Sequence, residues 1–387
     1  MSKRLAIVST HPIQYNAPLF TLLAQQGAIE IFVFYTWGEK VLSQKFDPGF
    51  GKTIEWDIPL LHGYNFTFIE NVAKVPGSHH FMGIDNPGLV NAIKVFKPDA
   101  VMVYGWAFKS HLQVLLYFHK KIPVLFRGDS TLLDETAGIK KLLRRLWLRW
   151  VYRHIDVALY AGSANKTYFA AHGVRDSQLQ FLPHAVDNHR YRTVGSSEVI
   201  TTWRKDLCIP EDAILYLFAG KLEPKKNPGL LAEAFDAVGM VNAHLLIAGN
   251  GILEAALKTT WAGKPHIHFI PFQNQSMMPS LYQTANVFVL PSQGPGETWG
   301  LAINEAMAAE LAVIASNKCG AAFDLIKDGI NGYIFESGNP ESLQSALEKT
   351  NDTIKSATMG KASVALIKSW NYNIMAEIIE RAVNKSL

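Results

Sequence analysis

The chain has 387 residues, of which 48% are hydrophobic and 18% are charged, and its formal net charge is +4. This length exceeds that of one ordinary domain, and the composition excludes wholesale disorder. The two cysteines, Cys208 and Cys319, lack metal-ligand spacing and suit a reducing compartment. No apolar run reaches the roughly 18 residues of a membrane-spanning helix, and the first residues lack a signal-peptide layout. We therefore expect a cytoplasmic protein of two or three domains.

Short apolar or β-branched runs alternate with helical patterns along the chain. Strands are predicted near residues 5–9, 29–35, 100–104, 123–126, 157–160 and 180–182, and then near 214–218, 244–248, 267–270, 287–290 and 312–315. Strands that alternate with helices form parallel sheets covered on both faces. The two series therefore predict an α/β protein with two doubly wound domains, whose shared ligand would lie at the carboxyl ends of the strands.

A polar stretch over residues 188–199 interrupts the apolar periodicity between the two series. It predicts a first domain over 1–192 and a second over 193–369. The last stretch, about 370–387, is predicted to be one helix that packs back on the first domain.

Lysines cluster where the strand near 214–218 is followed by a helix that begins near Pro228. Lys221, Lys225 and Lys226 lie in the turn, and Asn227 is a candidate N-cap. Fixed positive charge beside free backbone N–H groups suits a phosphate. A solvated basic turn remains an alternative.

A second turn, Gly249-Asn250-Gly251, follows the strand near 244–248. Two glycines would let the backbone pass close to a bound anion, although many tight turns look the same.

The third and most informative segment covers residues 287–316, where a strand, a glycine-rich loop and a small-residue helix follow one another. Glu297 lies on the loop, and Glu305 lies within the helix, about 7–8 Å along its axis from Gly300 at 1.5 Å per residue. The N–H groups of Gly300 and Leu301 lie at the helix N-terminus, which suits a diphosphate. Two carboxylates that can accept hydrogen bonds from hydroxyl groups, on either side of an anion-binding site, suit a sugar linked to a nucleotide. The alternative is an acidic residue that complements the helix dipole together with an exposed helical glutamate.

The sequence contains no Asp-x-Asp pair, no zinc-type His/Cys spacing and no Gly-Lys-Thr/Ser phosphate loop. A bound diphosphate would therefore be neutralised by lysines and helix N-termini, and we expect no metal site. The mild positive charge does not require a nucleic-acid partner, and we expect none.

These three segments, in this order, resemble the C-terminal domain of the retaining glycosyltransferases of family 4, which have the GT-B fold. The matching blocks are Gly220-Lys221-Leu222…Lys226, Gly249-Asn250-Gly251 and the stretch from Pro291 to Ala308, which carries two glutamates separated by seven residues. Residues 320–335 and the stretch that starts at 156 also resemble family segments. The resemblance covers most of residues 156–340 and implies two Rossmann-like domains that face each other across a cleft.

The resemblance implies a role for each matching residue. Lys221 and Lys226 would grip the donor diphosphate, Glu305 would bind the ribose, and Glu297 with the Gly300 and Leu301 amides would hold the donor sugar. Lys221 stands where the family more often has arginine, so a point charge replaces a bidentate contact. The further donor-binding candidates are Gly220, Asn250, Gly251, Phe272, Gln273, Thr298 and Trp299, with Phe272 and Gln273 expected near the base.

The first domain matches the family less well. Where the family often has a histidine near the donor sugar, this chain has Arg127 and Asp129. Either residue would contact the sugar or the acceptor, and a buried strand-end ion pair is the competing interpretation.

The first strand-to-helix turn, residues 10–16, contains no glycine. In a GT-B fold it faces the acceptor, with His11 as a candidate proton acceptor and Gln14, Tyr15 and Asn16 on the acceptor-side rim. A turn and capping role set by Pro12 and Pro18 is the alternative.

The activity implied is a hexosyltransferase that works without a metal, by front-face displacement with retention. Its co-substrate would be a UDP- or GDP-type sugar with no bound cofactor, and its acceptor a glycan or lipid-linked glycan of bacterial surface-polysaccharide synthesis. On this basis Lys226→Ala should lower turnover greatly with stability nearly unchanged. The alternatives are a GT-B epimerase or phosphorylase, and a non-catalytic GT-B scaffold.

Residues 139–153 form a strongly amphipathic pattern. Its apolar positions are Ile139, Leu142, Leu143, Leu146, Trp147, Trp150 and Val151, and six lysines and arginines take the other face. One interpretation is peripheral contact with the inner face of an anionic membrane. The other is a helix whose apolar face packs on the sheet and whose basic face is solvated.

Overall fold

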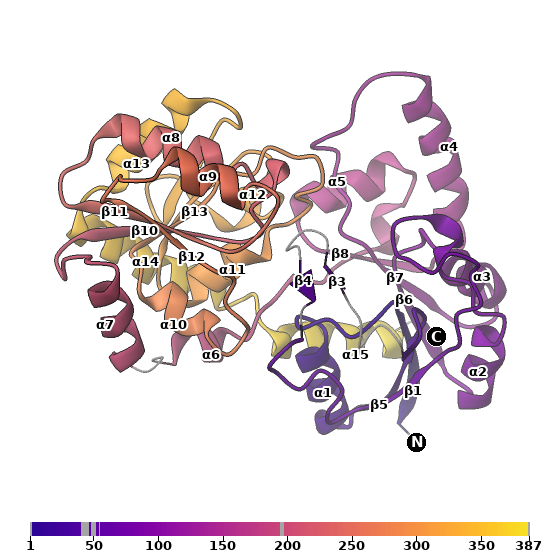
Figure 1. Cartoon of the computed structure of the whole chain (residues 1–387). Coiled ribbons are helices and arrows are strands. Elements are labelled where there is room, and N and C mark those ends of the chain that lie inside the picture. The colour runs from indigo at the N-terminus through magenta and orange to yellow at the C-terminus, as the bar shows by residue number, and fades with distance from the viewer. Residues whose placement is uncertain (1, 40–45, 48–51, 54, 194–196, 386–387) are drawn as a thin grey trace. The chain divides into compact units, whose positions relative to one another are not determined.

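The computed structural model describes residues 2–39, 46–47, 52–53, 55–193 and 197–385. The chain forms two compact units (Figure 1). Unit 1 comprises Met1–Lys45, Ile58–His184 and Tyr372–Leu387, and unit 2 comprises Phe46–Asp57 and Ala185–Asn371. Each unit is a parallel sheet with helices on its faces, so the predicted α/β class with two doubly wound domains is confirmed.

The sheet of unit 1 has seven parallel strands in the order β5-β2-β1-β6-β7-β8-β9. They are β1 (Lys3–Ser9), β2 (Ile29–Tyr35), β5 (Asn65–Phe68), β6 (Ala100–Tyr104), β7 (Val124–Arg127), β8 (Val157–Tyr160) and β9 (Leu179–Phe181). The helices are α1 (Ala17–Gln26), α2 (Leu89–Phe96), α3 (Lys109–Phe118), α4 (Ile139–Tyr152), α5 (Ser163–Ala171) and α15 (Tyr372–Lys385). The strand order reverses between β1 and β6, and ligands of such sheets bind at the carboxyl ends beside this point.

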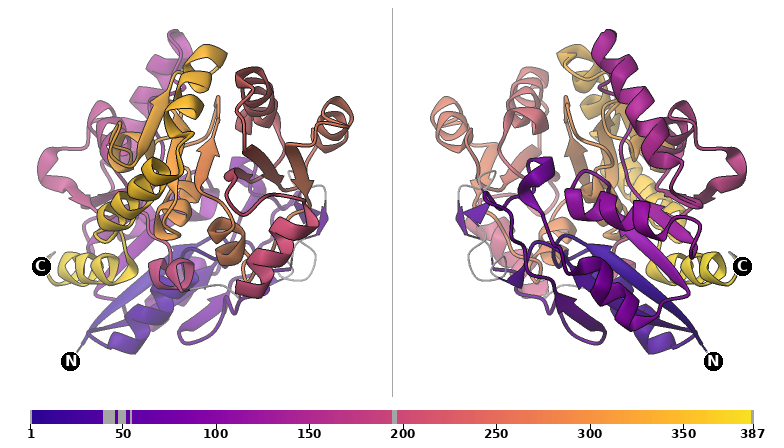
Figure 2. Two further views of the ribbon diagram at one scale, coloured as in Figure 1. Left: turned by 90° about the vertical axis from the view of Figure 1, so that its left-hand side faces the viewer. Right: turned by 90° about the vertical axis from the view of Figure 1, so that its right-hand side faces the viewer.

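The last helix, α15, packs against α1 and β1, which lie at the other end of the sequence. Figures 1 and 2 show it in yellow alongside these indigo elements. Contacts divide the units after His184 rather than after residue 192, because α6 (Asn188–Arg192) packs on helices of unit 2. Residues 194–196 of the expected linker and 386–387 of the expected last helix lie outside the described residues.

The sheet of unit 2 has six parallel strands in the order β12-β11-β10-β13-β14-β15. They are β10 (Ile214–Ala219), β11 (Ala243–Ala248), β12 (Ile267–Ile270), β13 (Val287–Leu290), β14 (Ala312–Ser316) and β15 (Gly332–Phe335). Besides α6, the helices are α7 (Ser197–Asp206), α8 (Pro228–Val238), α9 (Glu254–Thr260), α10 (Met278–Gln283), α11 (Leu301–Ala308), α12 (Ala322–Leu325), α13 (Pro340–Thr350) and α14 (Thr353–Ile367). The short strands β3 (Phe46–Asp47) and β4 (Lys52–Thr53) pair antiparallel.

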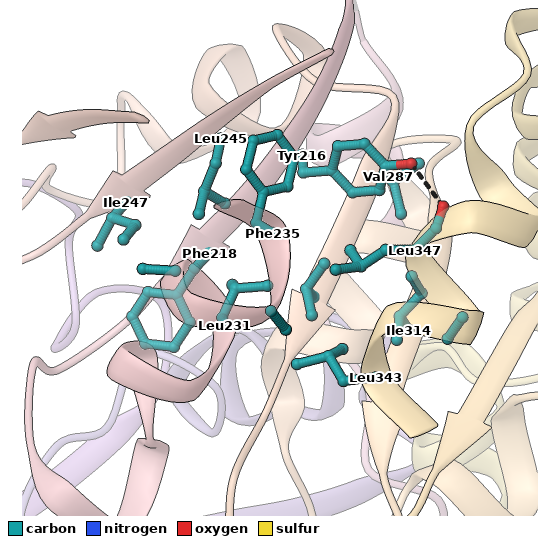
Figure 3. Packing of buried hydrophobic residues seen from close by; sticks show 14 of the residues in the cluster. Tyr216, Phe218, Leu231, Phe235, Leu245, Ile247, Val287, Ile314, Leu343 and Leu347 are labelled. Carbon is teal, nitrogen blue, oxygen red and sulfur yellow. Dashed lines mark hydrogen bonds between the residues drawn. The ribbon is translucent and has the colours of Figure 1, made fainter. Parts of the chain in front are cut away.

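The core of unit 2 forms where α8 and α13 cover the central strands (Figure 3). Phe218 and Tyr216 of β10 pack with Phe235 of α8 and Leu347 of α13. The buried Tyr216 hydroxyl donates to the Leu347 carbonyl at 2.9 Å. This bond removes the cost of burying a phenolic hydroxyl and ties α13 to the sheet.

Unit 1 contains a buried histidine that the sequence did not single out. His111 of α3 is fully buried, and its Nδ1 lies 2.9 Å from the Tyr104 carbonyl while its Nε2 lies 2.8 Å from the Thr36 hydroxyl. Because a carbonyl only accepts, Nδ1 carries the proton of the neutral ring. Burial lowers the pKa of His111 to about 4.

This pKa predicts a pH dependence of stability. Below the unfolded pKa of about 6.5, the unfolded chain binds a proton at residue 111 that the folded chain excludes until about pH 4, so stability falls as the solution is acidified. Between about pH 7 and about pH 5, we expect wild type to lose about 2 kcal/mol more unfolding free energy than His111→Gln. Urea unfolding at both pH values measures this difference. Equal losses in the two proteins would contradict the assignment.

Candidate active site

Three loops of unit 2 meet at the carboxyl ends of β10, β11 and β13. The backbone N–H of Leu222 donates to the Asn250 carbonyl, and the N–H of Leu253 donates to the Leu222 carbonyl, both at 2.9 Å. The N–H of Gln293 donates to the Lys225 carbonyl at 2.8 Å. These main-chain bonds bring together the three segments that the sequence singled out.

Lys226 and Glu297 form an ion pair in these loops. Lys226 ends a single 3₁₀ turn (Pro224–Lys226), and its Nζ lies 2.5 Å from Glu297 Oε2. The exposed fractions of the two side chains are 18% and 9%. The Ser292 hydroxyl also donates to Oε2, at 2.9 Å. Glu297 is therefore a mostly buried carboxylate with a fixed position, not a solvated residue that only complements a helix dipole.

Gly300 is the N-cap residue of α11 and has φ of 96°, in the left-handed region that favours glycine. A Cβ at this position would also crowd the Leu290 side chain. The first N–H groups of α11, from Leu301 onward, follow directly. Thr298 precedes the helix on the same loop as Glu297. The loop thus places a carboxylate and a helix N-terminus side by side.

The Trp299 side chain points into the packing of unit 2. Its indole is buried, donates to Asn304 Oδ1 at 2.8 Å, and stacks on Trp370 with ring centroids 5.3 Å apart. The indole thus fixes the loop to α11, so any contact of residue 299 with a donor would come from its backbone.

Glu305 lies on α11 and is buried, which rules out the exposed helical glutamate considered above. Its Oε1 accepts from the Tyr191 hydroxyl at 2.5 Å, and its Oε2 accepts from the Tyr282 hydroxyl at 2.8 Å. These tyrosines, on α6 and α10, were not predicted. A buried carboxylate requires donors, but the sequence does not show which distant hydroxyls supply them.

The loop after β12 is joined to the glycine turn through Asn250. Its Oδ1 accepts from the Phe272 N–H at 2.9 Å, and its amide donates to Glu254 at 2.7 Å. The Asn250 side chain therefore links the loop after β12 to the start of α9. Gln273, next to Phe272, donates to the Pro271 carbonyl.

Residues 55–57, from the chain between β2 and β5, also contact this loop, which the sequence did not indicate. The Asn274 amide donates to the Glu55 carbonyl at 2.7 Å, and the Ser276 hydroxyl and N–H donate to the Asp57 carboxylate. The Trp56 ring approaches Phe272 edge-on with centroids 6.3 Å apart. A segment of the first half of the chain thus belongs to unit 2.

The two glycines of the turn after β11 are needed because other backbone lies against them. Gly249 has φ of 147°, and a Cβ there would collide with the Gly220 carbonyl. A Cβ at Gly251 would strike the backbone of Leu222. The close approach thus fixes Gly220 and Lys221, which is half-buried, against the glycine turn.

Gly249→Ala should therefore lower the unfolding free energy by about 2 kcal/mol, the typical effect of overpacking. The matched control is Gly239→Ala at the C-cap of α8, where φ is also positive but a Cβ meets nothing within 4 Å. The control should lose less unfolding free energy, because its alanine is strained only by the left-handed backbone conformation. Chemical denaturation of both variants measures the difference, and equal losses would contradict the steric argument.

Asn227 stands at the N-cap of α8, as predicted, but its side chain does not cap the helix as we expected. The residue has left-handed dihedrals, and its amide donates to Gln293 Oε1 at 3.3 Å. Asn227 therefore links the loops after β10 and β13.

In unit 1, the turn after β1 places His11 beside Thr10 and Trp37. His11 Nδ1 lies 2.9 Å from the Thr10 hydroxyl, and its ring meets Trp37 edge-on at 5.3 Å. Asn16 is the N-cap residue of α1 with helical dihedrals, and its N–H donates to the Ile13 carbonyl. His11, Gln14, Tyr15 and Asn16 are all half-buried.

Arg127, at the end of β7, is buried and donates to main-chain carbonyls. NH1 bonds Leu159 at 3.1 Å and Leu182 at 2.5 Å, and NH2 bonds Pro183 at 3.3 Å. Burial lowers its pKa to about 10, so it stays charged near neutral pH. Asp129 is half-exposed, with an oxygen 3.9 Å from His184 Nε2. The Arg127 guanidinium thus donates to main-chain carbonyls. The sequence had instead suggested a contact with the sugar or acceptor, or an ion pair.

Among the residues that the structure describes, no group of three or more His, Cys, Asp or Glu side chains could hold a metal ion. Over the same part of the chain, every helix is too short or too polar to cross a bilayer.

Comparison with known proteins identifies much of unit 2. Residues 199–363 match the family model of glycosyl transferases group 1. This part of unit 2 is therefore similar to the glycosyl transferases of group 1. The match includes the lysine turn, the glycine turn and both glutamates, whereas the turn after β1 and the end of β7 lie outside it.

Relatives extend the likeness beyond this domain. The sulfoquinovosyl transferase of Arabidopsis thaliana is 25% identical over 72% of this chain and 55% of its own length. A D-inositol 3-phosphate glycosyltransferase of Geodermatophilus obscurus is 29% identical over 46% of this chain and 41% of its own. The chain thus spans about half the length of these relatives.

Solved structures share the fold of the whole chain. HepE of Anabaena, solved in complex with UDP, superimposes with a TM-score of 0.74 over 100% of both chains at 16% identity. The predicted GT-B fold class, with its two Rossmann-like domains, is confirmed.

Proposed function

We propose that the chain is a retaining glycosyltransferase of family 4 that moves a hexose from a nucleoside-diphosphate sugar to a glycan or glycolipid acceptor. The observation that carries this proposal is the Lys226–Glu297 pair beside the N-terminus of α11. A cation, a carboxylate and helix N–H groups at the carboxyl ends of parallel strands suit a sugar joined to a diphosphate.

In this proposal the cations and the helix end bind the diphosphate. Lys226 and Lys221 supply charge, while the first N–H groups of α11 and the Gly251 backbone supply donors. Lys226 would exchange part of its contact with Glu297 for a phosphate oxygen when the donor enters. No metal is required for this neutralisation.

The two glutamates take the hydroxyl groups of the donor. Glu297, fixed by Lys226 and Ser292, would accept from the donor sugar. Glu305 would accept from the ribose, with Tyr191 and Tyr282 setting its position. Phe272 and Gln273 would contact the base.

The reaction is a displacement on one face of the sugar. The bond between the anomeric carbon and the diphosphate oxygen breaks, the acceptor oxygen bonds to that carbon on the same face, and the acceptor proton passes to the departing diphosphate. Lys226 and the α11 N–H groups would stabilise the charge that develops on the leaving group. The acceptor would enter from the side of His11, Gln14, Tyr15 and Asn16, with bacterial surface-polysaccharide synthesis as the proposed setting.

A ligand-induced melting-temperature screen tests the proposal. UDP, GDP, ADP and CMP, each alone and as sugar conjugates, are added to wild type and to Glu305→Gln. One diphosphate should stabilise wild type and do so less in Glu305→Gln, and its conjugate should be slowly hydrolysed. Stabilisation by none of the nucleotides would refute the proposal.

A further inference from the structure

Helix α4 carries a continuous apolar surface that the fold leaves open to solvent. The exposed fraction is 78% for Ile139, 60% for Leu143 and 55% for Leu146. The apolar stripe, as we call it, consists of Ile139, Leu142, Leu143, Leu146, Trp147 and Trp150, all exposed. Their spacing of three or four residues places them on one face of the helix.

The opposite face of α4 packs on unit 1. Leu148, Val151 and Tyr152 are buried there, and the same face holds two cations. Lys141 Nζ and Arg145 NH2 bind Glu135 Oε2 at 2.7 and 3.0 Å. The interpretation in which the apolar stripe packs on the sheet under a solvated basic face is therefore wrong. The fold turns the stripe outward.

Basic residues border the stripe on both sides. At 3.6 residues per turn, Lys140 and Arg144 lie along one edge, and Arg149 and Arg153 lie along the other. Residues 138–154 contain no Asp or Glu. Large exposed apolar patches rimmed by polar groups mark interaction sites rather than ordinary surface.

Two tryptophans widen the stripe toward the sheet. Trp147 and Trp150 lie with ring centroids 4.9 Å apart, and Trp147 meets Trp106 edge-on at 6.3 Å. Trp106 follows β6, whose carboxyl end lies at the reversal of strand order. Tryptophan favours the boundary between water and lipid, because one end of its ring is apolar and the other donates a hydrogen bond.

We propose that α4 docks unit 1 onto the surface of an anionic lipid bilayer, with the helix axis parallel to the membrane plane. The apolar stripe enters the boundary of the acyl chains, while the flanking lysines and arginines extend to acidic headgroups. A second copy of this chain fits the surface poorly, because two such stripes face to face would juxtapose their like-charged borders. The docking does not depend on the proposed sugar transfer.

Vesicle flotation tests the apolar part of the proposal. Wild type should float with vesicles of phosphatidylcholine mixed with phosphatidylglycerol, and far less with phosphatidylcholine alone. Leu143→Glu should lower the partition coefficient by about tenfold or more, because the leucine side chain no longer buries apolar surface in the bilayer. The matched control is Ile354→Glu on α14, where the side chain is 79% exposed. It should bind as wild type does, and unchanged melting curves would show that both variants fold.

A second variant tests the charges. Lys140→Gln with Arg144→Gln should weaken binding to anionic vesicles by about fivefold for each residue removed, and added salt should reduce the difference. No flotation of wild type with anionic vesicles would overturn the proposal. It would equally be overturned if sedimentation showed a wild-type dimer that Leu143→Glu dissociates, which would assign the stripe to a second copy.

Discussion

Lys226→Ala is expected to lower the rate of sugar transfer by at least about a hundredfold, the usual effect of removing one group that stabilises charge on a leaving group. In the wild type, Lys226 Nζ lies 2.5 Å from Glu297 Oε2. Lys226 belongs to the loop that is hydrogen-bonded to the glycine turn after β11. Removing the ammonium takes away both a phosphate contact and the partner that fixes the Glu297 carboxylate. Initial rates with the donor found in the nucleotide screen measure the effect.

The matched control is Lys225→Ala, in the same turn. Lys225 is more exposed, and its Nζ lies 3.5 Å from Glu223 instead of at the glutamate of the site. This variant keeps the same net charge as Lys226→Ala and should retain its rate within about twofold, because exposed ion pairs contribute little. Equal losses in the two variants would show that the turn acts through its overall charge and not through Lys226.

The stability expected for Lys226→Ala changes once its partner is known. From the sequence alone, stability should have stayed nearly constant. In the structure, the variant removes the ammonium group beside the mostly buried Glu297 carboxylate, which keeps its hydrogen bond from the Ser292 hydroxyl. Because a buried charge that loses its partner is costly, we expect a loss of about 2 kcal/mol. The rate must therefore be compared at equal folded fraction.

Strands with mostly buried side chains were predictable from the sequence. Ile29–Tyr35, Ala100–Tyr104 and Val287–Leu290 have the predicted bounds, because apolar runs between breakers leave little choice of register. The edge strands β5 and β15 were missed. In β5 polar and apolar residues alternate over four positions, and β15 has three apolar residues after a glycine, so neither contains a long apolar run.

The site was predictable only in part. The order of the lysine turn, the glycine turn and the two glutamates follows from local pattern, since each lies where a strand ends. The hydroxyls of Tyr191 and Tyr282 come from other helices, and the contacts of Trp56 come from a segment far away in the chain. Such partners depend on tertiary packing, which periodicity does not encode.

The orientation of α4 shows the same limit. Its sequence defines an apolar and a basic face but not which of them packs inward. In the structure, Leu148, Val151 and Tyr152 pack inward, and Glu135 binds Lys141 and Arg145 on the same side. An amphipathic pattern thus predicts a helix with two unlike faces, and tertiary packing determines which face is covered.

Arg127→Met should lower the unfolding free energy of unit 1 by about 4 kcal/mol. The substitution retains apolar volume but leaves the buried carbonyls of Leu159, Leu182 and Pro183 without the donors that Arg127 supplies, each costing about 1–3 kcal/mol. The matched control is Arg175→Met, because Arg175 is exposed and bonds Gln178 beside it, so its loss should stay within about 0.5 kcal/mol. Calorimetry of both variants measures the change.

Nucleotide binding, which we assign to unit 2, should persist in Arg127→Met under conditions where unit 1 stays folded. A variant that keeps wild-type stability but loses sugar transfer would instead assign Arg127 to the donor sugar or the acceptor, the role that its position in the sequence first suggested.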